Sequence, residues 1–222
     1  MSKYPEIDAV LAGETDGCLQ VGNAVDLLAA IKPRPHLIVT DPPYAFSGCG
    51  PEHQLTATVA VVLRESARLL RRDSWMLVFC AASWRSTAYM ADALRGVVVP
   101  VRIGRWCKPV ARTRVKTGGW QWAGVNVLVL KKGRPRTPAA DIVDHIVAEP
   151  LKSGRRAELP PVVADWAVRP YAVPGGLLLD PFAGSGALLA AGQRAGMRHL
   201  GFELQVAAAR GQLELVGEGG GE

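Results

Sequence analysis

The sequence predicts an α/β protein built on a mostly parallel, doubly wound sheet. Short continuous apolar runs alternate along the chain with segments whose apolar residues recur at helical spacing. Several of these runs are too uniformly apolar for a strand with one solvated face, which indicates strands covered on both sides. At 222 residues the chain is long enough for one such domain and too short for two with separate cores. We therefore expect a single domain over residues 1–216 and a disordered tail at 217–222.

The individual elements follow from the apolar pattern and its breaks. Seven strands are expected, at residues 18–21, 36–41, 74–80, 97–108, 123–132, 176–180 and 199–203. Helices are expected at residues 24–31, 56–71, 84–95, 157–171, 187–196 and from 205 onward. The two longest strands are separated by a polar linker without helical spacing. They therefore predict an antiparallel pair at the sheet's edge, with one antiparallel edge strand in an otherwise parallel sheet.

Composition excludes several classes of protein. No apolar run reaches the roughly 20 residues of a membrane span, and the N-terminus lacks the apolar core of a signal peptide, so a cytoplasmic protein without a membrane partner is expected. The four cysteines are scattered, without a CxxC pair or a histidine at ligand spacing. We expect reduced thiols and no metal site.

The net charge of +6 is concentrated in one stretch. Residues 100–140 contain ten basic and no acidic residues, which leaves 16 basic against 20 acidic residues elsewhere. A concentrated basic segment suits a polyphosphate partner, because phosphate neutralisation releases condensed counterions. A solvated basic loop is the alternative interpretation of this segment taken alone.

The first motif with chemical content is Asp41-Pro42-Pro43-Tyr44, directly after a predicted buried strand. Ligands of open α/β sheets bind beyond the carboxyl ends of the strands. Proline has no N–H group, so the carbonyls here can be rigid acceptors beside the Asp41 carboxylate, and together they suit an NH₂ group. Tyr44 offers an aromatic face for a planar base, and Phe46 another. An ordinary Asp-Pro-Pro turn with a tyrosine anchor is the structural alternative.

The second motif is the glycine turn DPFAGSG at residues 180–186, between a predicted strand and a helix. Gly184 and Gly186 allow a ligand to approach the backbone at a helix N-terminus. The turn is not the full GxGxxG of dinucleotide binders, and Glu203 ends the next strand, where an acid can accept hydrogen bonds from ribose hydroxyls. A nucleoside-like ligand without a required phosphate is expected, with a purely structural glycine turn as the alternative.

Together these segments resemble a known family. LLLDPFAGSG resembles the S-adenosylmethionine motif of class I (Rossmann-like) methyltransferases, and VTDPPY resembles the catalytic motif of their amino-methylating branch. The catalytic motif here precedes the cofactor motif by about 140 residues. This circularly permuted order resembles the beta group of DNA adenine-N6 and cytosine-N4 methyltransferases over nearly the whole chain.

The resemblance implies the site residues. The catalytic residues would be Asp41, Pro42, Pro43 and Tyr44. The S-adenosylmethionine contacts would be Asn23, Asp180, Phe182, Ala183, Gly184, Ser185, Gly186 and Glu203. Contacts to DNA would come from Phe46, Arg105, Lys108, Arg112, Arg114, Lys116, Trp120 and Trp122, several of them in a short basic recognition loop near residues 109–122. Asn23 stands where the family often has aspartate, and Trp106-Cys107-Lys108 resembles its Trp-x-Lys.

The implied reaction transfers a methyl group to the exocyclic amine of an extruded base. The resemblance favours adenine N6 over cytosine N4, because Asp at the first motif position is commoner among the adenine enzymes of this family. So short a loop predicts short or relaxed sequence specificity, or recognition shared between subunits, and a homodimer is expected. An RNA or protein amino-methyltransferase of similar motif and a catalytically silent nucleic-acid-binding homologue are the alternative functions.

Overall fold

The computed structural model describes residues 2–43, 52–109, 123–138, 142–151 and 158–204, and of residues 52–56 the backbone. One sheet of eight strands has the order β1-β8-β7-β2-β3-β5-β4-β6. The strands are β1 (Gly17–Val21), β2 (Leu37–Thr40), β3 (Ser74–Ala81), β4 (Val99–Cys107), β5 (Gly124–Lys132), β6 (His145–Val147), β7 (Leu177–Asp180) and β8 (Arg198–Glu203). The helices are α1 (Pro5–Ala12), α2 (Ala24–Ile31), α3 (Glu52–Leu69), α4 (Trp84–Ala93), α5 (Pro161–Val168) and α6 (Ala187–Arg194), with a 3-10 turn η1 (Arg169–Tyr171) after α5.

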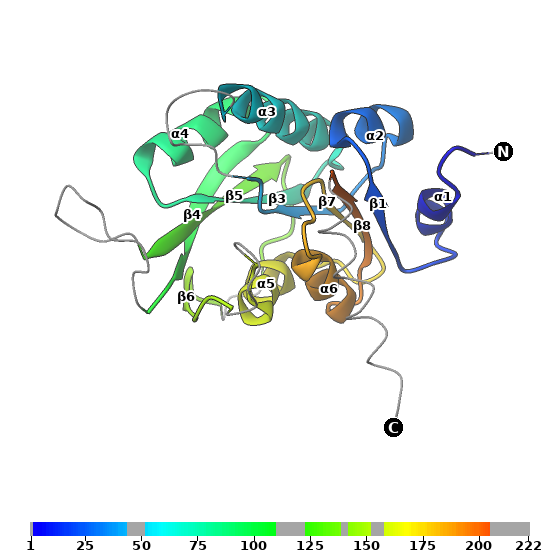
Figure 1. Ribbon diagram of the computed structural model, residues 1–222. Coiled ribbons are helices and arrows are strands. Elements are labelled where there is room, and N and C mark those ends of the chain that lie inside the picture. Colours follow the sequence, from blue (N-terminus) through cyan, green and yellow to red (C-terminus); the bar gives the residue numbers. More distant parts are fainter. Residues whose placement is uncertain (1, 44–51, 110–122, 139–141, 152–157, 205–222) are drawn as a thin grey trace.

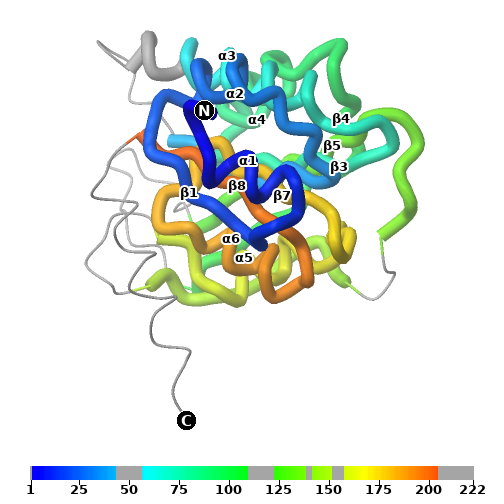
Figure 2. Tube along the Cα trace, turned by 90° about the vertical axis from the view of Figure 1, so that its right-hand side faces the viewer, coloured from blue at the N-terminus to red at the C-terminus, as the bar shows by residue number. Residues whose placement is uncertain are grey.

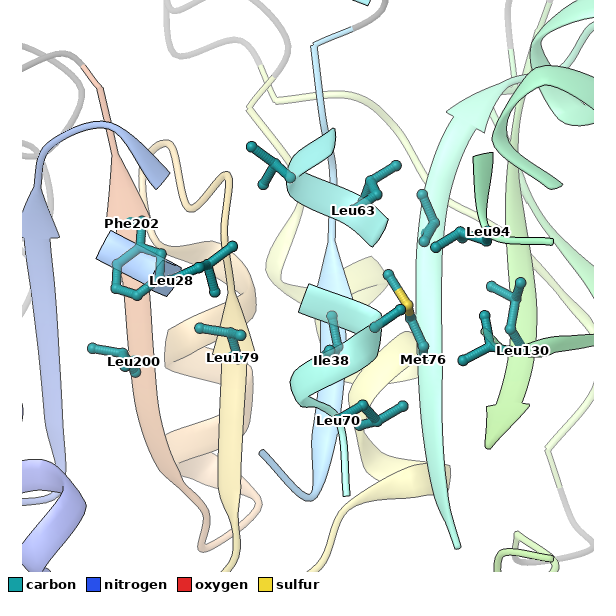
Figure 3. Packing of buried hydrophobic residues seen from close by; sticks show 14 of the residues in the cluster. Leu28, Ile38, Leu63, Leu70, Met76, Leu94, Leu130, Leu179, Leu200 and Phe202 are labelled. Carbon is teal, nitrogen blue, oxygen red and sulfur yellow. The ribbon is translucent and has the colours of Figure 1, made fainter. Parts of the chain in front are cut away.

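Helices cover both faces of the sheet, as the doubly wound prediction requires. Helices α2, α3 and α4 lie on one face, and α5 and α6 on the other (Figure 1). Helix α1 lies beside β1 and β8 (Figure 2). The face under α2–α4 buries Ile38, Met76, Leu179 and Leu200 from the central strands (Figure 3), and their neighbours in sequence face α5 and α6. This two-sided burial explains why the strands are continuously apolar rather than alternating.

Two details of the predicted sheet are wrong. The sheet has eight strands rather than seven, because the three-residue β6 pairs in parallel with β4; its apolar run is too short to indicate a strand in the sequence. The antiparallel strand is not an edge strand: β5 lies inside the sheet, antiparallel to both β3 and β4. The long 97–108 and 123–132 stretches do form the expected antiparallel pair.

Helix α1 was not predicted, although its ends carry recognisable signals. Pro5 occupies its first turn, and Gly13 ends it in a left-handed conformation with φ of 82°. Ile7 and Val10 are its buried residues. Eight residues with two buried side chains give too short a periodic pattern to separate from a loop.

A lysine joins the end of α3 to the end of β5. The Nζ of Lys132 donates hydrogen bonds to the carbonyl oxygens of Ala67 (2.9 Å), Arg68 (2.7 Å) and Leu70 (2.8 Å). These carbonyls lie in the last turn of a helix or just beyond it, where they lack intrahelical partners and where a cation is favoured.

Lys132→Met should therefore lower the free energy of unfolding by about 1.5–3 kcal/mol, the range for hydrogen bonds to a charged group. Chemical denaturation measures this, and Lys131→Met on the same strand is the matched control, with an expected change of less than about 0.5 kcal/mol. Equal stability of the two variants would show that the Lys132 contacts contribute nothing.

Candidate functional site

The predicted catalytic and cofactor motifs meet at one edge of the sheet. Strands β1, β8, β7 and β2 are neighbours and run parallel, so their carboxyl ends lie together. Asn23 follows β1, Asp41 follows β2, Asp180 ends β7 and Glu203 ends β8. Residues more than 160 positions apart in sequence are thereby brought to the same edge, which we call the carboxyl edge.

Asp180 links the two central strands of this edge. Its side chain is 1% exposed. Its Oδ1 accepts a hydrogen bond from the Thr40 hydroxyl (2.6 Å) and another from the backbone N–H of Phe182 (3.1 Å). The carboxyl thus links the end of β2 to the start of the glycine turn. Because it is buried, it contacts the turn from the interior of the protein. Thr40 was missed by the sequence interpretation; its signal is a hydroxyl in an otherwise apolar strand.

The glycine turn is fastened to the end of β8. The N–H of Gly184 donates to Glu203 Oε2 (2.9 Å), and the N–H of Ala183 donates to the carbonyl of Phe202 (2.9 Å). Gly184 has φ of 53°, and a Cβ built on it would meet no atom within 4 Å. The backbone therefore borders open space at the position where the sequence predicted close approach of a ligand. Gly186, with φ of 82°, precedes the first residue of α6.

Asp41, Pro42 and Pro43 leave the sheet directly after β2. Asp41 is half-buried, Pro42 buried and Pro43 exposed. The Asp41 carboxylate lies close enough to the ends of β7 and β3 to raise the pKa of Asp180 and of Cys80, in both cases as a smaller contribution than burial. The first three motif residues thus lie beside the glycine turn. Tyr44 and Phe46 lie outside the described residues.

Asn23 lies at the same edge but serves the helix that follows it. Its Oδ1 accepts the backbone N–H of Val25 (2.9 Å), which makes it the N-cap of α2. The N–H of the preceding Gly22 donates to the carbonyl of Glu203 (2.9 Å), which ties the ends of β1 and β8 together. Asn23 therefore lies near the glycine turn, because Glu203 accepts hydrogen bonds from both Gly22 and Gly184.

Of the predicted contacts to DNA, Arg105 and Lys108 are described, at the end of β4. Arg105 is exposed, and its Nε donates to Oδ1 of Asn126 (3.2 Å), whose Nδ2 donates to Thr87 Oγ1 (3.1 Å). Lys108 Nζ lies 4.8 Å from the ring centroid of Trp106. Its backbone N–H donates to the Ala123 carbonyl (2.6 Å), so both ends of the 109–122 segment lie at the carboxyl edge. Arg112, Arg114, Lys116, Trp120 and Trp122 lie outside the described residues.

The basic segment is not one local feature. Strand β5 runs from Gly124 at the carboxyl edge to Lys132 at the opposite, amino edge, a distance of about 27 Å at ~3.4 Å per residue. Arg105 and Lys108 therefore belong to the carboxyl edge, whereas Lys131, Lys132, Arg134 and Arg136 belong to the amino edge. The interpretation of residues 100–140 as a single basic feature is wrong, because a hairpin separates charges that are close in sequence.

The Asp180 carboxyl group should make the free energy of unfolding depend on pH. Burial, with smaller contributions from Asp41 and Glu203, raises the pKa of Asp180 from 3.8 to about 7. The folded protein then keeps a proton that the unfolded chain releases near pH 4, so the unfolding free energy falls as pH rises from about 4 to about 7.

In Asp180→Asn the amide oxygen can still accept from Thr40 and Phe182 without a titrating group. We expect its stability relative to the wild type to increase from pH 5 to pH 8, measured by urea unfolding at both values. Parallel changes in the two proteins would contradict the raised pKa.

The described part of the chain shows no clear sign of a metal site, a reactive thiol or a membrane-spanning helix. Among these residues no three His, Cys, Asp or Glu side chains are grouped to hold a metal ion. The described cysteines, Cys18, Cys80 and Cys107, are free, and burial raises the pKa of Cys18 and Cys80 to about 11, which makes both poor nucleophiles. None of the described helices is long and apolar enough to cross a bilayer.

Comparison with solved structures places this architecture among known folds. The crystal structure of M1.HpyAVI in complex with S-adenosylmethionine superposes with a TM-score of 0.73, covering 89% of this chain and 98% of that one at 19% sequence identity. The PvuII DNA methyltransferase, which is cytosine-N4-specific, superposes with a TM-score of 0.71, covering 90% of this chain and 86% of that one at 15% identity. The fold is that of the class I methyltransferases.

Further similarities agree with this methyltransferase fold. TTHA0409 of Thermus thermophilus, a candidate DNA modification methylase solved with S-adenosylmethionine, has a TM-score of 0.70 and 24% identity over 89% of this chain and 91% of its own. YubD of Escherichia coli strain K12, a candidate methylase, is 28% identical over 198 residues, which are 82% of this chain and 78% of YubD. No protein-family model matches the chain.

Proposed function

We propose that this chain is an S-adenosylmethionine-dependent DNA methyltransferase that modifies the exocyclic N6 amine of adenine. The observation that carries the proposal is the adjacency of two motifs. Asp41-Pro42-Pro43 follows β2 and the glycine turn follows β7, and these strands are neighbours in the sheet. An amine held at the first motif would therefore lie beside a cofactor held at the second. M1.HpyAVI and TTHA0409 were solved with S-adenosylmethionine, which supports that choice of cofactor.

The residues of the carboxyl edge fit this cofactor. Open space beyond Gly184 leaves the turn accessible to a ligand. The negative charges of Asp41 and Glu203 raise the pKa of Asp180 beyond the effect of burial, so a cationic ligand at this edge would offset the repulsion among these carboxyl groups. S-adenosylmethionine would supply a methyl group whose bond to the positively charged sulfur breaks as the amine bonds to the methyl carbon; a neutral thioether would leave and the amine would release one proton. Gly184 and Glu203 would position the ligand, with Asp180 holding the turn through Thr40 and Phe182.

The first motif would activate the amine. The lone pair of an aryl amine is delocalised into the ring, which makes it a poor nucleophile. Hydrogen bonds from the NH₂ group to the Asp41 carboxylate and the Pro42 carbonyl would favour a pyramidal nitrogen and offset its developing positive charge. Proline at both following positions leaves no N–H to compete for these acceptors. Tyr44 would hold the extruded base by stacking.

The choice between adenine and cytosine as the target base depends on one residue of the first motif. Aspartate at the first motif position, Asp41, resembles the adenine enzymes, whereas the PvuII enzyme of the same fold is specific for cytosine N4. Both bases present an exocyclic amine that this chemistry accepts, so cytosine N4 is the second candidate. We further propose that the chain is circularly permuted, because the catalytic motif precedes the cofactor motif in sequence.

Contacts to the DNA backbone would come from the carboxyl edge as well. Arg105 and Lys108 lie there, together with the ends of the 109–122 segment that carries Arg112, Arg114, Lys116, Trp120 and Trp122. So few candidate base contacts support short or relaxed sequence specificity. A homodimer remains our expectation for the assembly.

The substrate class is tested by offering radiolabelled S-adenosylmethionine with unmethylated DNA, RNA or a protein extract in separate reactions. We expect label in DNA, and none above background in the other two. Label in RNA or protein alone would contradict the proposal, and cofactor binding without transfer to any of them would indicate a catalytically silent homologue.

A further inference from the structure

We propose a second nucleic-acid site: a groove at the amino edge of the sheet that binds a single strand through its phosphates and its unstacked bases. This amino-edge groove, of about 500 Å³, is lined by Arg71, Arg72, Arg136, Arg169, Trp75 and Tyr171 among others. It lies near the start of β3, about 23 Å along that strand from the carboxyl edge at ~3.3 Å per residue. It does not depend on the proposed methyl transfer.

The groove concentrates uncompensated positive charge. Its four arginines come from the α3–β3 connection, the segment after β5 and the end of α5, and all four are exposed. Within the described part of the chain, the ion pairs that form lie elsewhere, and none of them includes these arginines. The acid in the groove, Asp73, accepts the backbone N–H of Arg134 with its Oδ1 (2.6 Å). Exposed arginine side chains offer planar donors to phosphate oxygens.

The charges of nearby arginines affect the pKa of a histidine in the groove. Burial, with added repulsion from the charges of Arg71 and Arg198, lowers the pKa of His36, which also lines the groove. Burial is the larger cause, and the contribution of Arg71 agrees with a positive potential at this end of the groove.

Aromatic rings lie beside these arginines. Trp75 and Tyr171 meet edge to face, with ring centroids 5.3 Å apart and an interplanar angle of 62°. The Trp75 indole N–H donates to the Arg136 carbonyl (3.0 Å), which fixes the ring. Both rings also line an adjoining cavity of about 350 Å³, whose wall includes Trp166, held by its own N–H to the Val143 carbonyl (3.0 Å).

This combination favours a single strand over other anions. A positive groove that tracks phosphates, with aromatic faces for bases, is the arrangement by which proteins bind single strands without reading sequence. A duplex keeps its bases stacked inside and could use the arginines but not the aromatic cavity. Arg136 also belongs to the part of the basic segment, residues 100–140, that lies at the amino edge and not at the carboxyl edge.

The groove is tested by titrating the full chain into a fluorescently labelled 12-nucleotide oligothymidylate and following anisotropy at several salt concentrations. In the double variant Arg71→Gln/Arg136→Gln we expect affinity to fall at least tenfold. The slope of log affinity against log salt should fall by about 1.4, because each lost phosphate contact in a single strand accounts for about 0.7. Transfer of methyl groups to a short duplex should be unchanged in this variant.

The control double variant is Arg68→Gln/Arg95→Gln, which removes the same charge from ion-paired arginines of the α3–α4 layer. Its affinity for the oligonucleotide should stay within twofold of the wild type. Equal losses in the two double variants, or no loss in either, would overturn the proposal.

Photocrosslinking of an oligonucleotide that contains 5-bromouracil locates the bound bases. We expect crosslinked peptides that contain Trp75 or Tyr171. Crosslinks confined to residues 41–46 or 109–122 would overturn the proposal, because the single strand would then bind only at the carboxyl edge. The wild type could also bind duplex and single strand with equal affinity, and lose affinity for both equally in Arg71→Gln/Arg136→Gln. That result would overturn the proposed stacking of bases on the aromatic rings.

Discussion

Replacing Asp41 by alanine is expected to lower kcat for methyl transfer by at least about a hundredfold, while the Kd for S-adenosylmethionine stays within about threefold. Asp41 would accept a hydrogen bond from the amine while positive charge develops on it. Removing this acceptor therefore destabilises the transition state more than the bound substrate, which lowers kcat. Asp41 adjoins the glycine turn, whose described hydrogen bonds to side chains are accepted by Asp180 and Glu203, so the acceptors that hold the turn remain in this variant. Single-turnover rates and calorimetric titration of the cofactor separate the two effects.

Asp41→Asn is the informative companion variant. It keeps one acceptor oxygen and removes the charge, so its kcat should lie between those of the wild type and Asp41→Ala. If both variants instead lost cofactor affinity and rate together, Asp41 would belong to the cofactor site and the proposed role would be wrong.

Gly184→Val should weaken cofactor binding at least about a hundredfold. The backbone here has φ of 53° and borders open space, so the added isopropyl group would occupy the volume proposed for the ligand. Valine in a left-handed conformation also costs about 1–2 kcal/mol in its own right. Calorimetric titration of the variant with S-adenosylmethionine measures the loss.

A matched glycine separates strain from blockage. Gly96 has φ of 79°, and a Cβ built on it also meets no atom within 4 Å, but it lies between α4 and β4 at the amino edge. Gly96→Val should carry the same conformational cost and bind the cofactor normally. Similar cofactor affinities for the two variants would place the ligand away from Gly184.

The sequence predicted the strands best where burial is two-sided. The runs at 36–41, 74–80 and 176–180 became β2, β3 and β7, because strands covered on both faces need apolar residues at every position. The three-residue β6 carries no such requirement, since an edge strand is held by its backbone pairing with β4. The interior place of β5 also escaped prediction, because strand order depends on long-range pairing.

The candidate site was predictable as two local motifs and unpredictable in its internal contacts. The acid-proline and glycine turns are contiguous in sequence, and the parallel topology brings them together. The hydrogen bonds from Thr40 to Asp180 and from Gly184 to Glu203 span 140 and 19 residues, and no spacing rule indicates them. The charges of residues 100–140 were interpreted as one local feature because sequence proximity hides the direction of a hairpin.

The most direct test of the proposed activity identifies the methylated nucleoside. Unmethylated duplex DNA is incubated with labelled S-adenosylmethionine and either wild type or Asp41→Ala, digested to nucleosides and resolved by mass spectrometry. We expect N6-methyladenine from the wild type and none from the variant. N4-methylcytosine would keep the mechanism and change the base, whereas wild-type DNA without any methylated nucleoside, despite demonstrated cofactor binding, would contradict the proposed function.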